Sequence, residues 1–140
     1  MHKCTTTQLI NRIRKSDDLE LLSDYDEDID NPTVGKFLQE QLAKRDMGVS
    51  ELASEIMLDR TFVYQMMSGT RMPNRTHLLR IALALRLSLD DAQRMLRIAR
   101  KGELYPRIRR DAAIIFAVQK KLTISETNEM LEGLGEQTLL

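Results

Sequence analysis

Residues 51–69 constrain the fold of this chain more than any other stretch, because they predict two short helices joined by a tight corner at residues 57–59. Asp59 is suited to cap the second helix, since its carboxylate can accept unpaired backbone N–H groups of the next turn. Gly69 can end that helix in the left-handed conformation without a Cβ penalty. Apolar residues recur at helical spacing in each half: Leu52, Ala53 and Ile56, then Val63, Met66 and Met67. Helices this short are unstable alone, so the flanking sequence must supply a scaffold.

The flanking sequence predicts that scaffold, because residues 33–100 have the periodicity of five helices joined by very short links. Thr33, Asn74 and Ser88 each precede an apolar periodic run and are expected to cap it. The first helix carries an apolar stripe formed by Val34, Phe37, Leu38 and Leu42. The expected helices cover residues 33–45, 48–56 or 50–56, 59–68, 75–86 and 89–100.

The two ends of the chain predict smaller helical elements. We expect an N-terminal arm in residues 1–32, with a weak amphipathic helix over residues 5–15 and an acidic linker at residues 23–30. Pro32 closes the arm, because proline disfavours helix at the residue before it. The remaining boundaries divide the chain into a central domain, residues 33–100, and a C-terminal extension, residues 101–140.

The C-terminal extension predicts a hairpin of two helices, over residues 107–121 and 123–134. Thr123 and Glu126 have the spacing of a capping box for the second helix. In the first helix we expect one inward face formed by Ile108, Ala112, Ile115 and Phe116, widened by Ile114, Ala117 and Val118. In the second helix, Leu131 and Leu134 are expected to face inward.

Composition favours an all-α protein that is not an enzyme. Aromatic residues make up 4% of the chain and Trp is absent, so Leu, Ile, Ala and Met form the core. Cys4 is the only cysteine and His77 lacks a second ligand at metal spacing, so we expect no disulfide, metal site or cofactor. No catalytic constellation is present. We expect a cytoplasmic protein without membrane association, because signal-peptide and membrane-spanning patterns are absent.

Charge is segregated along a chain whose net charge is zero. Residues 33–100 hold eleven basic and seven acidic residues, a net charge of +4, which suits a polyanionic partner. Residues 1–32 hold four basic and eight acidic residues, a net charge of −4. One hypothesis is that this acidic arm folds over the central segment and competes with the polyanion. Deletion of the arm would test it.

The spacing within residues 33–100 resembles the lambda-repressor-like helix-turn-helix domain of the Cro/CI, or XRE-family, transcriptional regulators. The resemblance is carried by Ala53, Val63, Met66, Gly69, Arg71-x-Pro73-Asn74, Leu78, Leu79 and Ile81-Ala82. Leu104-Tyr105-Pro106 and Arg109-Arg110-Asp111-Ala112 resemble an uncharacterised bacterial subgroup with a C-terminal helical extension. The resemblance implies a five-helix domain with an N-terminal helical arm and a C-terminal helical hairpin. It also implies a transcriptional repressor that binds double-stranded DNA sequence-specifically.

The resemblance places the second motif helix, residues 59–68, in the major groove, where side chains near its N-terminus read bases. Arginine can donate two hydrogen bonds to guanine, glutamine can pair with adenine, and a threonine methyl can meet a thymine methyl. The implied base contacts are Arg60, Thr61, Tyr64 and Gln65. The implied phosphate contacts, which set register and affinity, are Ser50, Ser68, Thr70, Arg71, Asn74 and Arg75.

We expect a homodimer, because one recognition helix reads only a few base pairs and relatives pair on palindromes. The C-terminal hairpin is the expected dimer surface or docking site for a protein partner. The chain departs from the family where Val49 or Ser50 replaces a common glutamine, and where Met57 replaces the corner glycine. Methionine is tolerable at this corner if Met57 keeps a negative φ, and its presence indicates a slightly altered corner. The alternative function is a protein-interaction adaptor or antitoxin-like module without strong DNA binding, which Glu51 and Glu55 favour.

Overall fold

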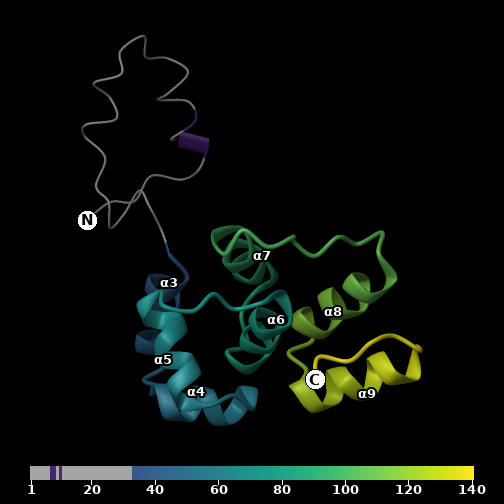
Figure 1. The fold of residues 1–140 in the computed structure, drawn as a ribbon. Coiled ribbons are helices and arrows are strands. Elements are labelled where there is room, and N and C mark those ends of the chain that lie inside the picture. Colours follow the sequence, from purple (N-terminus) through teal and green to yellow (C-terminus); the bar gives the residue numbers. More distant parts are fainter. Residues whose placement is uncertain (1–6, 9, 11–32) are drawn as a thin grey trace. The chain divides into compact units, whose positions relative to one another are not determined.

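The computed structural model describes residues 7–8, 10 and 33–140 (Figure 1). Residues 33–140 form one compact unit. The three described residues of the N-terminal part are helical. The remainder of the helix expected over residues 5–15 lies outside the described residues, as does the acidic run at residues 23–30.

Residues 33–140 fold into seven helices, and the part of the chain that the structure describes contains no strand. The helices are α3 (Val34–Lys44), α4 (Val49–Ile56), α5 (Arg60–Ser68), α6 (Arg75–Ala84), α7 (Leu89–Ile98), α8 (Arg109–Gln119) and α9 (Ile124–Gly133). This confirms the predicted all-α fold, and each helix lies within two residues of its expected range. Among the described residues, no helix is both long enough and apolar enough to cross a membrane.

Side-chain caps begin four of the helices at the residues that the sequence predicted. Thr33, Asn74, Ser88 and Thr123 each accept a hydrogen bond from the backbone N–H three residues later. Glu126 completes the predicted capping box, since its carboxylate accepts the Thr123 N–H at 2.9 Å. The cap expected at Asp59 is wrong in part. Asp59 occupies the N-cap position of α5, but its exposed carboxylate accepts no capping hydrogen bond.

All seven helices end in the same left-handed turn, and the links between them are short except for residues 99–108 between α7 and α8. In each turn, one residue has a positive φ, and the N–H of the next residue donates to the carbonyl five residues back. Glycine usually fills this position because it lacks a Cβ. Here only Gly69 and Gly135 do so; the others are Asp46, Met57, Arg86, Arg100 and Lys121. Five of the helix ends therefore carry backbone strain.

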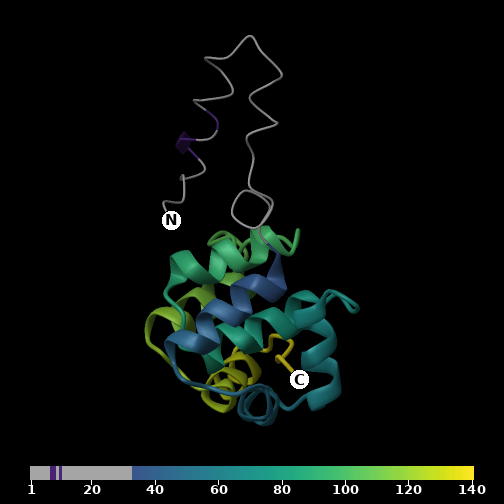
Figure 2. The ribbon, with the colours of Figure 1, turned by 90° about the vertical axis from the view of Figure 1, so that its left-hand side faces the viewer.

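Helix α6 lies at the centre of the unit and contacts α4, α7, α8 and α9 (Figures 1 and 2). Helix α3 packs against α5 and α7. The core is continuous from the first helices to the last, since Leu38, Leu79 and Leu131 are all fully or almost fully buried. The C-terminal hairpin of α8 and α9 therefore shares the core of the preceding five helices.

Helix α8 buries Ile114, Ala117 and Val118, the residues expected to widen its inward face, and not Ile108 and Phe116, which were expected to form it. Its buried side is formed by Ala113, Ile114, Ala117 and Val118. Ile108 and Phe116, expected to face inward, are 53% and 49% exposed. The apolar residues of α8 occupy nearly all of its faces, so the periodicity of the sequence could not select the inner face. Leu134 is also 36% exposed because α9 ends before it, and Leu139 is fully buried.

Gly35 allows α3 and α5 to approach closely. A Cβ built on Gly35 would lie 2.1 Å from the carbonyl oxygen of Met67, well inside van der Waals contact. The contacting atom belongs to the backbone of α5, so a side-chain rotation cannot relieve the clash. Gly35 therefore helps to fix the position of α5 on the scaffold.

Candidate nucleic-acid interface

The corner between α4 and α5 is built on a left-handed Met57, whose φ and ψ are 60° and 41°. Met57 therefore does not meet the condition of a negative φ under which methionine would be tolerable at this corner. The turn needs a left-handed residue so that the N–H of Met57 can reach Ser54 O at 3.3 Å and that of Leu58 can reach Ala53 O at 3.0 Å. The conformation costs a non-glycine residue about 1–2 kcal/mol. The Met57 side chain is 54% exposed.

The inward faces of α4 and α5 fix the direction of α5. Ala53 is 3% exposed, and Val63 and Met66 of α5 are buried against the core. The small side chain of Ala53 suits the contact between these two helices. Because the inward face is fixed, the opposite face of α5 is presented to solvent. Exposed residues on it are Arg60, Thr61, Tyr64 and Ser68, with Gln65 half-buried.

The N-terminal ends of α4 and α5 meet through Arg60. Its Nη1 lies 3.5 Å from the Oγ of Ser50, and both side chains are exposed. Ser50 was expected to contact phosphate and Arg60 to contact bases. The structure thus brings one expected residue of each kind to the same edge of the motif.

The loop after α5 is organised around the carbonyl oxygen of Gln65. This oxygen accepts the N–H of Thr70 at 2.9 Å and of Arg71 at 3.2 Å. It also accepts the hydroxyl of Ser68 at 3.1 Å. The hydroxyls of Ser68 and Thr70 lie 2.9 Å apart. Three of the expected phosphate contacts, Ser68, Thr70 and Arg71, are therefore gathered at the C-terminal end of α5.

Arg71 is held in place by an aromatic stack that the sequence analysis did not foresee. Its guanidinium carbon lies 4.9 Å from the centroid of the Phe62 ring, a cation–π arrangement. The Phe62 ring meets the His77 ring edge-on, with centroids 4.9 Å apart and an interplanar angle of 69°. Phe62 and His77 are half-buried, whereas Arg71 is exposed. The stack orients a cation without removing it from solvent.

His77 links the stack to the start of α6. Its backbone N–H donates to Asn74 Oδ1 at 2.8 Å, and its Nδ1 accepts the Asn74 N–H at 3.4 Å. Burial lowers the pKa of His77, and the positive charges of Arg80 and Arg71 lower it further. The neutral ring is therefore favoured, as an Nδ1 acceptor requires. The described residues contain no cluster of three or more His, Cys, Asp or Glu able to hold a metal ion.

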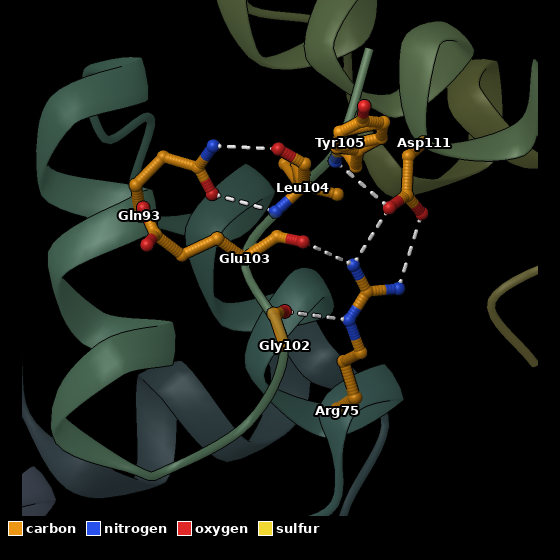
Figure 3. Close-up of polar contacts among 7 residues, drawn as sticks. All are labelled: Arg75, Gln93, Gly102, Glu103, Leu104, Tyr105 and Asp111. Carbon is orange, nitrogen blue, oxygen red and sulfur yellow. Dashed lines mark hydrogen bonds and ion pairs between the residues drawn. The ribbon is translucent and has the colours of Figure 1, made fainter. Parts of the chain in front are cut away.

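Arg75 occupies a different environment from the other expected phosphate contacts (Figure 3). Its Nη1 and Nη2 donate to the two carboxylate oxygens of Asp111, at 3.1 and 2.9 Å. Its Nε donates to the carbonyl of Gly102 at 2.8 Å, and Nη2 also donates to that of Glu103 at 3.1 Å. The guanidinium therefore fastens α6 to α8 and to the segment between α7 and α8. Because these bonds occupy the guanidinium, Arg75 is not part of the proposed nucleic-acid interface.

The same segment is tied to α7 by Gln93 (Figure 3). The Gln93 side-chain amide donates to the Leu104 carbonyl at 2.8 Å and accepts the Leu104 N–H at 2.7 Å. The N–H of Tyr105 donates to Asp111 at 3.0 Å. Burial alone would raise the pKa of Asp111, but the bonds from Arg75 and Tyr105 lower it below its ordinary value. The carboxylate of Asp111 is thus an ionised junction between α8, α6 and the segment that precedes α8.

The geometry of α4 and α5 defines a helix-turn-helix protein. The inward faces of both helices are fixed against the core, and the outward face of the second helix, α5, is exposed. Residues 37–93 match the family model of the Cro/C1-type HTH DNA-binding domain. This part of the chain therefore has the lambda-repressor-like fold of a Cro/C1-type HTH domain, as the resemblance implied. No curated protein matches the chain, and no solved structure does.

Proposed function

We propose that the chain is a sequence-specific transcriptional repressor that reads the major groove with α5. The observation that carries this proposal is the exposed row of Arg60, Thr61 and Tyr64 on a helix whose other side is fixed by the core. Side chains at the N-terminal end of a recognition helix reach base edges, and arginine is well suited to guanine. Gln65, one turn further, extends the row.

Phosphate binding is assigned to the groups that surround this row. Ser50 lies beside Arg60 at one end of α5. Ser68, Thr70 and Arg71 lie at the other end, where the loop is held by the Gln65 carbonyl. Asn74 is exposed, and its amide group can donate to phosphate while its Oδ1 caps α6. Contacts at both ends of α5 would set the register of the helix on the duplex.

The proposed repressor acts as a homodimer through an apolar stripe on α8 and on the residues just before it. The stripe consists of Tyr105, Ile108, Ala112 and Phe116, and its three large members are 49–53% exposed. The last three recur at four-residue spacing, which aligns them along one side of the helix. A second copy suits this stripe because paired recognition helices read two half-sites. Sedimentation of Phe116→Glu should show a monomer, whereas Met72→Glu, at another exposed apolar residue, should sediment like the wild type.

Selection of bound duplexes from a random pool tests the proposed function. The wild-type chain should enrich one motif with two related half-sites, and its affinity should fall steeply with salt. Arg60→Ala and Gln65→Ala should weaken binding to the enriched duplex. Arg100→Ala, a control at the exposed end of α7, should leave binding unchanged.

The second candidate function is a protein-interaction adaptor that keeps the fold without strong DNA binding. It is favoured by Glu51 and Glu55, which are exposed on α4 beside the proposed interface. The selection separates the two functions. Failure to retain any duplex at low salt would establish the adaptor function and reject the repressor.

A further inference from the structure

A groove lies between the corner of the helix-turn-helix motif and the C-terminal hairpin. Its volume is about 690 Å³, within the range of sites that hold small organic molecules. One side is formed by Glu55 and Met57 and by the C-terminal end of α6, and the opposite side by α9. Both sides of the groove belong to the compact unit formed by residues 33–140.

The groove combines an apolar floor with an acidic rim. Leu83, Ala84, Leu122 and Ile124 are buried or half-buried residues of the lining. Glu55, Glu129 and Glu132 bring three carboxylates to it, against one guanidinium from Arg86. Among the residues that the structure describes, none of these carboxylates takes part in a salt bridge. The lining therefore carries an uncompensated negative charge beside apolar surface.

Buried Arg80 connects the two sides of the groove. Its Nη1 donates to the carbonyl of Ile56, the last residue of α4, at 3.3 Å. Its Nε donates to the carbonyl of Leu139, the neighbour of the groove residue Leu140. Asn128, which also lines the groove, accepts the Leu139 N–H at 2.6 Å. These bonds hold the groove open in a defined shape, as a preformed binding site requires.

We propose that this groove binds an organic cation with a bulky apolar body. The apolar floor receives the body, and the carboxylates of Glu55, Glu129 and Glu132 attract the charge. The occupant also contacts Met57, the strained residue at the corner before α5. Strained backbone at such a position is a common feature of ligand-responsive sites. A regulatory effect of the occupant on DNA binding rests on the proposed function, whereas the site itself does not.

Two probes of nearly equal shape and opposite charge test the site. Tetraphenylphosphonium should bind the full chain in calorimetry, and tetraphenylborate should bind at least tenfold more weakly. Replacement of two rim carboxylates in the double variant Glu129→Gln/Glu132→Gln should lower the affinity for tetraphenylphosphonium roughly 3- to 10-fold, since each exposed charge contributes modestly. Both residues are exposed on α9, so the fold should persist. Glu136→Gln, outside the lining, is the matched control and should bind like the wild type.

Methyl NMR of the methionines locates the probe. The Met57 methyl signal should shift on addition of tetraphenylphosphonium, while that of Met72, which is 66% exposed and outside the groove, should not. Equal binding of the two probes, no binding at millimolar concentration, or an unmoved Met57 signal would overturn the proposed site. An unchanged affinity in the double glutamine variant would overturn the role of the rim.

DNA affinity measured with and without the probe tests the regulatory effect. Saturating tetraphenylphosphonium should change the Kd for the selected duplex at least about fivefold, the usual lower range of allosteric coupling. In Glu129→Gln/Glu132→Gln the same change should need a roughly 3- to 10-fold higher probe concentration, which controls for binding of the probe to DNA. A smaller change with probe binding intact would overturn regulation but keep the site. If the wild-type chain does not bind DNA in the absence of the probe, the proposed function and its regulation are overturned. The proposed ligand site is unaffected by that outcome.

Discussion

Arg75 and Asp111 form a bidentate ion pair, with both carboxylate oxygens within 3.1 Å of the guanidinium. The pair joins the first residue of α6, immediately after the loop that follows α5, to the C-terminal hairpin. The Asp111 side chain is only 5% exposed and that of Arg75 is 29% exposed. The hairpin is therefore fastened to α6 by a polar contact as well as by the shared core.

Removal of the Asp111 carboxylate should destabilise the fold markedly. Asp111→Ala leaves Arg75 and the Tyr105 N–H without their acceptor, and we expect a loss of about 2–3 kcal/mol of unfolding free energy in urea. Glu103→Ala is the matched control. It breaks the Arg97–Glu103 ion pair, whose side chains are 55% and 44% exposed, and should cost less than about 1 kcal/mol. Equal losses in the two variants would contradict a structural role for the Arg75–Asp111 pair.

A methyl group at Gly35 should separate α3 from α5. Gly35→Ala places a Cβ against the backbone of Met67, and the resulting shift should cost about 1–3 kcal/mol of unfolding free energy. At Gly133, the last residue of α9, a Cβ meets nothing within 4 Å. Gly133→Ala should therefore be neutral or stabilising, since alanine favours helix. Thermal unfolding of Gly35→Ala and Gly133→Ala measures the two effects. A Gly35→Ala chain as stable as the wild type would refute the close approach of α3 to α5.

Relief of backbone strain at the motif corner should stabilise the chain. Met57→Gly removes the left-handed penalty of about 1–2 kcal/mol but adds the greater flexibility of glycine, for a net gain of up to about 1 kcal/mol. The half-exposed Met57 side chain contributes little packing. Met57→Ala keeps the strain and is the control, for which no gain in urea denaturation is expected. A glycine variant less stable than the alanine variant would argue against strain at this corner.

The pH dependence of stability should reveal His77. Burial and the charges of Arg80 and Arg71 lower its pKa below the ordinary value of 6.5. The unfolded chain therefore takes up the proton more readily, so the stabilisation is present above pH 6.5 and is lost as the pH falls below it. His77→Gln can keep the reciprocal cap but cannot titrate. Between pH 7 and 5, wild type should lose more unfolding free energy than His77→Gln, and parallel profiles would contradict this role.

The sequence was sufficient to predict the helices and most of their caps, because these depend on local signals. Thr33, Asn74, Ser88 and Thr123 each act within one helical turn, and apolar spacing marked the core. The left-handed ends of α4 and α6 were not predictable, since Met57 and Arg86 give no glycine signal. Tertiary packing imposes these turns despite their local cost.

The functional surface was predictable only in outline. The position of Arg60 and Thr61 on the outward face of α5 follows from the periodicity that buries Val63 and Met66. The partner of Arg75 was not predictable, because Asp111 lies 36 residues further along the chain. The Arg71–Phe62 stack also depends on a loop returning to the helix that precedes it. The inner face of α8 required the tertiary contact with α6, because its apolar residues surround the helix.

The most direct test of DNA reading by α5 compares Arg60→Ala with Arg71→Ala on the selected duplex and on its single base-pair variants. Arg60→Ala should abolish discrimination at one base pair, a loss of about 1–3 kcal/mol. Arg71→Ala should weaken binding to all sequences alike and lower the salt dependence by about one phosphate contact. Fluorescence anisotropy titrations at several salt concentrations measure both effects. Unchanged base preference in Arg60→Ala, or no duplex binding by the wild type at low salt, would contradict the account.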